Sequence, residues 1–210
     1  MMKLAFFGDS ITEGMGASSI ENCYVKQVGE MLGAEVWNYG LAGTRIARTK
    51  NAKSNLHRRA IDFNLRTVLL ETSADRIFVF GGTNDFGHGD APMGEIGDYS
   101  PYTFHGSVNL LFSTLLGMYG KEKIVIILPL QRYNHSVKQN AFTGKYLKDY
   151  VDVLRYYVKL YGFKCIDLFE NGLPEPPAGI SEYFIDGLHP NDKGHKVLAE
   201  KICEFIKNDV

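Results

Sequence analysis

The chain has 210 residues, of which 45% are hydrophobic and 22% are charged, proportions that are typical of a globular protein. A chain of this length can bury a hydrophobic core without a disulfide or a structural metal, so we expect one domain over residues 1–210. The 23 lysines and arginines nearly balance the 24 aspartates and glutamates, for a formal net charge of −1. Because general nucleic-acid binders carry a basic excess, nucleic acid is not expected as a partner.

The number of cysteines and the lengths of the apolar runs indicate the cellular compartment of the protein. Cys23, Cys165 and Cys203 are too few and too scattered for a disulfide framework, and no two of them have the spacing of a zinc-binding pair. The apolar run near the start, residues 4–7, is shorter than the roughly 7–15 residues of a secretory signal. No apolar run approaches the roughly 20 residues of a membrane span. We therefore expect a cytoplasmic protein that does not bind a membrane.

Five short apolar runs predict β-strands. The first, third and fourth runs are continuously apolar, which indicates strands buried on both faces of a parallel sheet. The fifth run is shorter and weaker. In chain order, the runs cover residues 4–7, 35–39, 76–80, 123–128 and 163–168.

The segments between and after these runs carry hydrophobic residues at steps of three and four, which is the period of an amphipathic helix. Strands that alternate with helices through short links predict a doubly wound α/β fold, whose ligands bind at the carboxyl ends of the strands. Asp192 is expected to cap the last helix. Two segments rich in glycine or proline, 86–104 and 170–184, do not fit the pattern. The predicted helices cover residues 24–32, 55–69, 108–119, 146–160 and 197–206.

Polar motifs follow three of the predicted strands, and a fourth motif precedes the last predicted helix. They are Gly8–Gly14, Asn38–Thr44, Gly81–Asp85 and Asp186–Pro190. Because the carboxyl ends of parallel strands meet at one edge of a sheet, the first three motifs are expected to be neighbours. The fourth belongs to a loop that can return to the same edge.

The residue types in these motifs match the needs of acyl transfer. A serine hydroxyl is a weak nucleophile, so it needs a general base such as histidine, which in turn needs a carboxylate to orient it. Ser10, His189 and Asp186 can supply these three groups. The oxyanion of the transition state needs hydrogen-bond donors, which the Gly43 backbone N–H and the Asn84 side-chain amide can provide.

Together, the motifs resemble those of the SGNH hydrolases, also called the GDSL esterase/lipase family. Phe7–Ser10 matches the first family block, with Ile11 where the family name has leucine, and the other three motifs match the later blocks. The resemblance therefore covers nearly the whole chain. It implies a three-layer α/β/α, flavodoxin-like fold with about five parallel strands. It also implies hydrolysis of a carboxylic ester without a metal or cofactor.

The same resemblance assigns roles to individual residues. It implies Ser10 as the nucleophile, His189 as the base and Asp186 as the partner of the base. Gly43, Asn84 and the Ser10 backbone N–H are implied as the donors to the oxyanion.

Each of these residues alone also has a simpler explanation. Serine, aspartate and asparagine are common in turns, and a glycine such as Gly43 can serve only its backbone. The motif after the third strand carries a second carboxylate, Asp85. We interpret Asp85 as a group that holds its loop, although it could replace Asp186 as the partner of His189.

The expected function is that of a serine ester hydrolase that cleaves a small or medium acyl ester through an acyl-enzyme. The loops mix aromatic with polar residues, for example Tyr99, Arg132 and Tyr133, and such a mixture suits a sugar ring. Deacetylation of a carbohydrate is therefore the favoured reaction. A thioesterase or lysophospholipase of the same family is an alternative, as is a non-enzymatic binding module on a flavodoxin-like fold.

Overall fold

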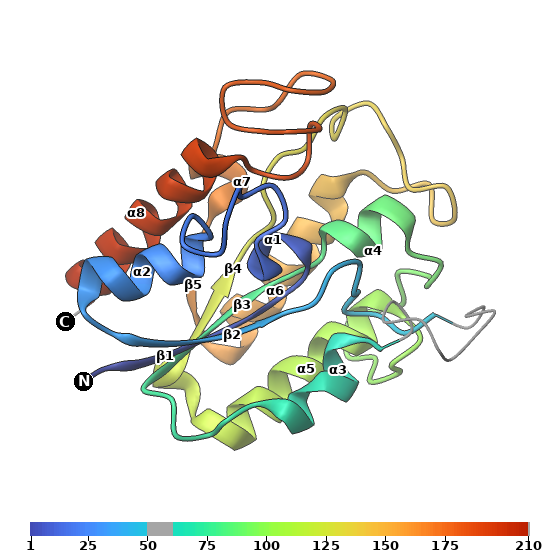
Figure 1. Cartoon of the computed structure of the whole chain (residues 1–210). Coiled ribbons are helices and arrows are strands. Elements are labelled where there is room, and N and C mark those ends of the chain that lie inside the picture. Colours follow the sequence, from blue (N-terminus) through green and yellow to red (C-terminus); the bar gives the residue numbers. More distant parts are fainter. Residues whose placement is uncertain (50–60, 210) are drawn as a thin grey trace.

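The computed structural model describes residues 1–49 and 61–209. Within these residues, one sheet of five strands lies between two layers of helices (Figure 1). All neighbouring strands are parallel, and their order across the sheet is β2-β1-β3-β4-β5. This is the strand order of flavodoxin-like folds, so the predicted fold class is confirmed.

The five predicted strands are all present, and their ends differ from the prediction by at most two residues. The strands are β1 (Lys3–Gly8), β2 (Glu35–Gly40), β3 (Arg76–Phe80), β4 (Ile124–Ile127) and β5 (Lys164–Ile166). β1, β3 and β4 are buried on both faces, as their continuous hydrophobicity indicates. β2 forms an edge of the sheet and is partly exposed.

Four longer helices pack on the sheet: α2 (Tyr24–Leu32), α5 (Phe104–Tyr119), α6 (Leu147–Tyr161) and α8 (Asp192–Asn208). Shorter elements are α1 (Ser10–Glu13), α3 (Phe63–Arg66), η2 (Thr67–Leu69), α4 (Thr83–His88), η3 (Lys121–Lys123) and α7 (Leu168–Asn171). No helix in the described ranges is both long and apolar enough to cross a membrane.

Two helix predictions differ from the structure: the helix expected over 55–69, and the cap of the last helix. Of the helix expected over 55–69, residues 55–60 lie outside the described residues, and the remainder contains only the short elements α3 and η2. The prediction that Asp192 caps the last helix is wrong, because the side chain of Asn191 accepts the hydrogen bond from the Gly194 N–H at 3.1 Å. Asp192 is instead the first residue of α8 and accepts hydrogen bonds from Ser18.

The two faces of the sheet belong to two separate hydrophobic cores. Side chains alternate along β1, so that Ala5 and Phe7 pack towards α3, α5 and α6, whereas Leu4 and Phe6 pack towards α2 and α8. All four side chains are at most 1% exposed. Burial on both faces therefore fixes the face of the sheet to which each side chain points, and with it the register of the strands.

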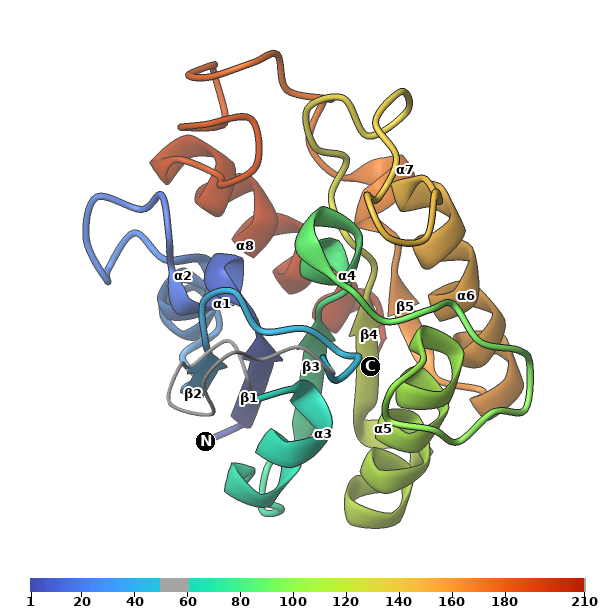
Figure 2. The ribbon, with the colours of Figure 1, turned by 90° about the vertical axis from the view of Figure 1, so that its right-hand side faces the viewer.

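The strand register brings the carboxyl ends of β1, β2 and β3 together. Gly8, the last residue of β1, pairs with Gly40 of β2 on one side and with Phe80 of β3 on the other. The loops that follow these three residues therefore start in one row. Figure 2 shows α1 and α4 side by side above this row, at the carboxyl ends of β1 and β3.

Gly40 is required where β2 passes α1. A Cβ atom at Gly40 would lie 2.0 Å from the backbone nitrogen of Glu13 and 2.5 Å from its Cα. These are backbone atoms of a neighbouring element, so they cannot move aside as a flexible side chain would. The close approach holds the end of β2 against the helix that begins at Ser10.

We expect Gly40→Ala to lower the free energy of unfolding by about 3 kcal/mol. This is the upper end of the roughly 1–3 kcal/mol that overpacking typically costs, because the obstructing atoms belong to the backbone. Gly117→Ala is the control, since Gly117 lies within α5 and a Cβ there would meet no atom within 4 Å. Removing a helical glycine should leave stability equal or raise it by about 1 kcal/mol. Urea denaturation measures both variants, and equal stability of the two would contradict the close approach.

Candidate active site

Ser10 begins α1 directly after β1, and the Asp9 side chain caps this helix by accepting a hydrogen bond from the Ile11 N–H at 3.1 Å. The Ser10 Oγ atom lies 3.0 Å from Nε2 of His189. The other ring nitrogen of His189, Nδ1, lies 2.6 Å from Oδ2 of Asp186. The structure thus brings a hydroxyl, an imidazole and a carboxylate into one hydrogen-bonded row, although Ser10 and His189 are 179 residues apart in the chain.

The loop from Asp186 to His189 is folded around the carboxylate itself. Asp186 Oδ1 accepts hydrogen bonds from the Leu188 N–H at 3.0 Å and from the His189 N–H at 2.8 Å. Burial by itself would raise the pKa of Asp186, but the hydrogen bonds from the backbone and the ring of His189 lower the pKa below its ordinary value. Asp186 therefore stays ionised and holds the imidazole in one orientation.

The two predicted donors to the oxyanion lie close to each other, because Asn84 bonds to Thr44, the residue after Gly43. Gly43 has φ of 74°, in the left-handed region, and its backbone N–H has no hydrogen-bond partner among residues 1–49 and 61–209. Asn84 is buried in the first turn of α4, and its Nδ2 atom donates to the Thr44 carbonyl oxygen at 3.0 Å. An amide nitrogen carries two hydrogens, so one remains for a further acceptor.

His88 orients the Asn84 amide, a contact that the sequence interpretation missed. Its Nε2 atom lies 3.1 Å from Asn84 Oδ1. Because the Thr44 carbonyl can only accept, Nδ2 of Asn84 must face Thr44 and Oδ1 must face His88, so His88 donates from Nε2. The spacing of four residues would have indicated this pair if a helix had been predicted after Gly82.

Asp85 holds a loop, as its sequence interpretation suggested, but this is the loop that carries Gly43 and not its own. Its two carboxylate oxygens accept hydrogen bonds from the Ile46 N–H at 3.0 Å and the Ala47 N–H at 2.8 Å. Burial raises the pKa of Asp85 to about 7, although these two bonds act in the opposite direction. The carboxylate hydrogen-bonded to His189 is that of Asp186, not that of Asp85.

Arg66 ties the ends of β1 and β2 together beneath the site. Its Nη1 atom donates to the Gly8 carbonyl oxygen at 3.0 Å and to Thr44 Oγ1 at 2.8 Å, and its Nη2 atom donates to the Tyr39 carbonyl oxygen. The guanidinium carbon lies 4.7 Å from the centre of the Phe7 ring. Burial lowers the pKa of Arg66 to about 10, which leaves it a cation near neutral pH.

In the part of the chain that the structure describes, no group of three or more histidine, cysteine, aspartate or glutamate side chains could hold a metal ion. The three cysteines are free thiols, and Cys23 and Cys203 are buried.

A family model described as GDSL-like lipase/acylhydrolase matches residues 6–197. The chain belongs to the GDSL-like lipase/acylhydrolase family. Membership implies hydrolase activity, and the matched range includes the motifs that carry Ser10, Gly43, Asn84, Asp186 and His189.

Solved structures with the same fold come from several bacteria. A protein from Lactobacillus plantarum is 25% identical, with a TM-score of 0.80, over 99% of this chain and 97% of its own. A possible lipase from Chitinophaga pinensis is 22% identical, with a TM-score of 0.75, over 99% and 98% of the two chains. A lipase/acylhydrolase from Enterococcus faecalis is 23% identical, with a TM-score of 0.68, over 99% and 96%. No curated protein matches this sequence.

Asp9 is a buried carboxylate whose charge opposes folding. It is 2% exposed, and burial raises its pKa from the ordinary 3.8 to about 7, against the lowering effect of the Ile11 hydrogen bond and of the Arg66 and Arg132 charges. The folded state therefore binds a proton that the unfolded state releases. The stabilisation that this proton on Asp9 gives to the folded state is complete below about pH 4 and is lost as the pH rises through about 7.

We expect Asp9→Asn to gain stability relative to the parent protein as the pH rises from 4 to 8, because asparagine keeps the acceptor for Ile11 and carries no charge. The largest gain that this shift allows is on the order of 4 kcal/mol, at about 1.4 kcal/mol for each pKa unit. Melting temperatures across this pH range measure the difference, with Glu122→Gln as a surface control because that side chain is 74% exposed. A difference that shrinks with rising pH would contradict the raised pKa of Asp9.

Proposed function

We propose that this hydrolase is a serine esterase that cleaves a small or medium acyl ester through an acyl-enzyme. The observation that carries the proposal is the continuous row from Ser10 Oγ to His189 Nε2 at 3.0 Å and from His189 Nδ1 to Asp186 Oδ2 at 2.6 Å. Such a row of nucleophile, base and orienting carboxylate is the arrangement that activates a serine hydroxyl.

The first half of the reaction forms the acyl-enzyme. Asp186 accepts the hydrogen on Nδ1 of His189, which leaves Nε2 with a lone pair that faces the Ser10 hydroxyl. As Ser10 Oγ attacks the ester carbonyl carbon, its proton passes to Nε2. The imidazolium then gives this proton to the departing alcohol, and the acyl group stays on Ser10.

The negative charge on the carbonyl oxygen is stabilised by donors that are already in position. Gly43 offers a backbone N–H without a partner in the described residues, and Asn84 offers the second hydrogen of Nδ2. The Ser10 N–H, at the first turn of α1, has no acceptor within its own helix. These donors do not have to reorganise when the charge develops, which is the main source of such stabilisation.

The second half of the reaction reverses these roles. A water molecule takes the place of the alcohol, and Nε2 of His189 removes its proton as it attacks the acyl carbon. The bond to Ser10 Oγ breaks, and Ser10 recovers its proton from the imidazolium. The products are a carboxylic acid and the free enzyme.

Among esters, we favour an acetylated carbohydrate as the substrate. Tyr133 is 43% exposed, and its backbone N–H donates to the Gly187 carbonyl oxygen at 2.8 Å, so an aromatic ring stands next to the Asp186 loop. Aromatic rings stack on the apolar faces of sugars. Acetylated sugars compared with short-chain and long-chain nitrophenyl esters, thioesters and lysophospholipids test this preference. The family assignment favours an enzyme over the binding module.

Ser10→Ala is expected to reduce kcat for nitrophenyl acetate by about 10⁶-fold, as loss of a triad serine does elsewhere. The fold should persist, because the Asp9 cap of α1 does not use the Ser10 side chain. Steady-state kinetics and labelling with a fluorophosphonate measure the loss, with circular dichroism as the folding control. A variant that keeps a substantial part of the parent rate would rule out Ser10 as the nucleophile.

The two carboxylates are expected to respond differently to amidation. Asp186→Asn should lower kcat about 10⁴-fold, because the imidazole loses the partner that fixes its tautomer. Asp85→Asn should mainly lower the melting temperature, since an amide can accept from only one of Ile46 and Ala47 while its nitrogen opposes the other N–H. Parallel measurement of kcat and melting temperature separates the two roles, and a larger kcat loss for Asp85→Asn would contradict the pairing of Asp186 with His189.

A further inference from the structure

Arg132 is a cation beside the site that the proposed reaction does not use. It lies between β4 and α6, and its backbone is fixed on both sides. Before it, Nε2 of Gln131 donates to the Phe169 carbonyl oxygen at 2.8 Å. After it, the Tyr133 N–H donates to the Gly187 carbonyl oxygen at 2.8 Å.

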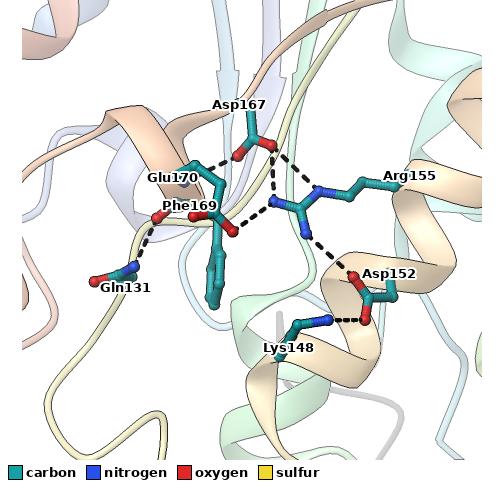
Figure 3. A network of polar contacts seen from close by, with 7 residues as sticks. All are labelled: Gln131, Lys148, Asp152, Arg155, Asp167, Phe169 and Glu170. Carbon is teal, nitrogen blue, oxygen red and sulfur yellow. Dashed lines mark hydrogen bonds and ion pairs between the residues drawn. The ribbon is translucent and has the colours of Figure 1, made fainter.

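The Phe169 carbonyl group that accepts from Gln131 belongs to a segment held by an ionic network (Figure 3). Arg155 of α6 binds Asp152 at 3.1 Å, Asp167 at 2.8 Å and Glu170 at 3.1 Å. Asp167 caps α7, which contains Phe169 and Glu170, so the network fixes the carbonyl that Gln131 uses. The position of the chain at Arg132 therefore does not depend on the loop alone.

The Arg132 side chain reaches the segment that carries Asn84, and the next residue in the chain contacts the loop that carries Asp186. Its Nη1 atom lies 3.4 Å from the Thr83 carbonyl oxygen and 3.5 Å from Thr83 Oγ1, and Thr83 directly precedes Asn84. Its neighbour Tyr133 is bonded to Gly187, which directly follows Asp186. The guanidinium consequently lies next to the segment of the proposed oxyanion donor Asn84, close enough to Asp186 to feel its charge.

Arg132 is short of partners for a half-buried cation. No carboxylate of residues 1–49 and 61–209 lies within ion-pair distance of it, and its Nε and Nη2 atoms have no hydrogen-bond partner there. Neither of these two atoms is sealed from solvent. Burial lowers the pKa of Arg132, while Asp186 and Asp9 oppose this effect from a longer range. A partly desolvated charge without a partner is costly, so its natural complement is an anion that arrives with the substrate.

The Asp186 carboxylate cannot easily become that partner. Its Oδ1 atom accepts hydrogen bonds from the Leu188 and His189 N–H groups, and its Oδ2 atom is bonded to the His189 ring.

Phe86 supports the Arg132 guanidinium from one side, with its ring centre 5.7 Å from the guanidinium carbon. The planar fork of an arginine can bind a carboxylate or phosphate through two parallel hydrogen bonds.

We propose that Arg132 binds an anionic group, a carboxylate or a phosphate, carried by the ester substrate. The inference rests on the proposed function and adds a substrate class to it. The anion belongs either to the acyl part or to the alcohol part of the ester. The rival explanation is that Arg132 only balances the charges of Asp186 and Asp9, in which case its removal would affect neutral and anionic esters alike.

Two matched pairs of substrates test the proposal. For the acyl side, 4-nitrophenyl hydrogen succinate is compared with 4-nitrophenyl butyrate, which has the same four-carbon acyl chain with a methyl group in place of the carboxylate. For the alcohol side, 4-acetoxybenzoate is compared with 4-methylphenyl acetate. In each pair, the ratio of kcat/KM between the parent protein and a variant removes the intrinsic reactivity of the ester.

Arg132→Met is expected to lower kcat/KM for the anionic member of one pair by roughly 10- to 100-fold, the range expected for a lost charge-assisted hydrogen bond. The neutral member should lose far less. The pair that responds identifies the side of the ester that carries the anion. Arg132→Lys should recover part of the loss, because the charge remains but the fork does not.

Two further variants separate position from charge. A Cβ at Gly87 would lie 2.6 Å from Nη1 of Arg132, so Gly87→Ala should displace the guanidinium and weaken the anion preference with the charge retained. Lys138→Met removes one positive charge from an exposed position of the same loop and should leave the preference as it is. Equal losses on both members of each pair, or no loss on either, would overturn the proposal. If the parent protein hydrolyses none of the four esters, or if Ser10→Ala hydrolyses them equally well, the proposed function itself is wrong.

Discussion

The parallel register at Gly8 is the constraint on which the site depends. Gly8 pairs with Gly40 and with Phe80, so the ends of β1, β2 and β3 lie in one row. Ser10 and the loops that carry Gly43 and Asn84 all start from this row. Burial of the strands on both faces prevents a shift of register, since a slip by one residue would exchange the side chains of the two cores.

Buried charges then join the loops that leave this row. Arg66 binds carbonyl oxygens at the ends of β1 and β2 together with the Thr44 hydroxyl, and Asp85 binds two N–H groups of the same loop. Asp9 caps the helix that begins at Ser10. Burial shifts the pKa values of all three groups towards their neutral forms. Part of the folding free energy is thus used to fix loop positions, which is a common feature of reactive sites.

Two connections between strands and helices surround the proposed reacting atoms. The segment before α8 contributes the Asp186 loop, whose N–H groups fold back onto its own carboxylate. The segment after β4 contributes Arg132, which is anchored through its neighbours to α7 and to the Asp186 loop. The proposed contact with the substrate therefore lies in connections that hydrogen bonds to rigid elements hold in place.

The sequence by itself determined the five strands, the four long helices and the fold class, because continuous apolar runs and helical periodicity are local properties of the chain. It also pointed to Ser10, His189 and Asp186, since their residue types follow strand ends or stand close together. Only the tertiary structure decided that Asp186 rather than Asp85 bonds to His189, and that His88, Arg66 and Arg132 lie at the site. The contacts of Arg66 and Arg132 join segments far apart in the chain, and that of His88 depends on the short helix α4, so none of them leaves a periodic signal. Where such side chains meet depends on how the loops fold over the sheet edge, which packing and hydrogen bonding set in three dimensions.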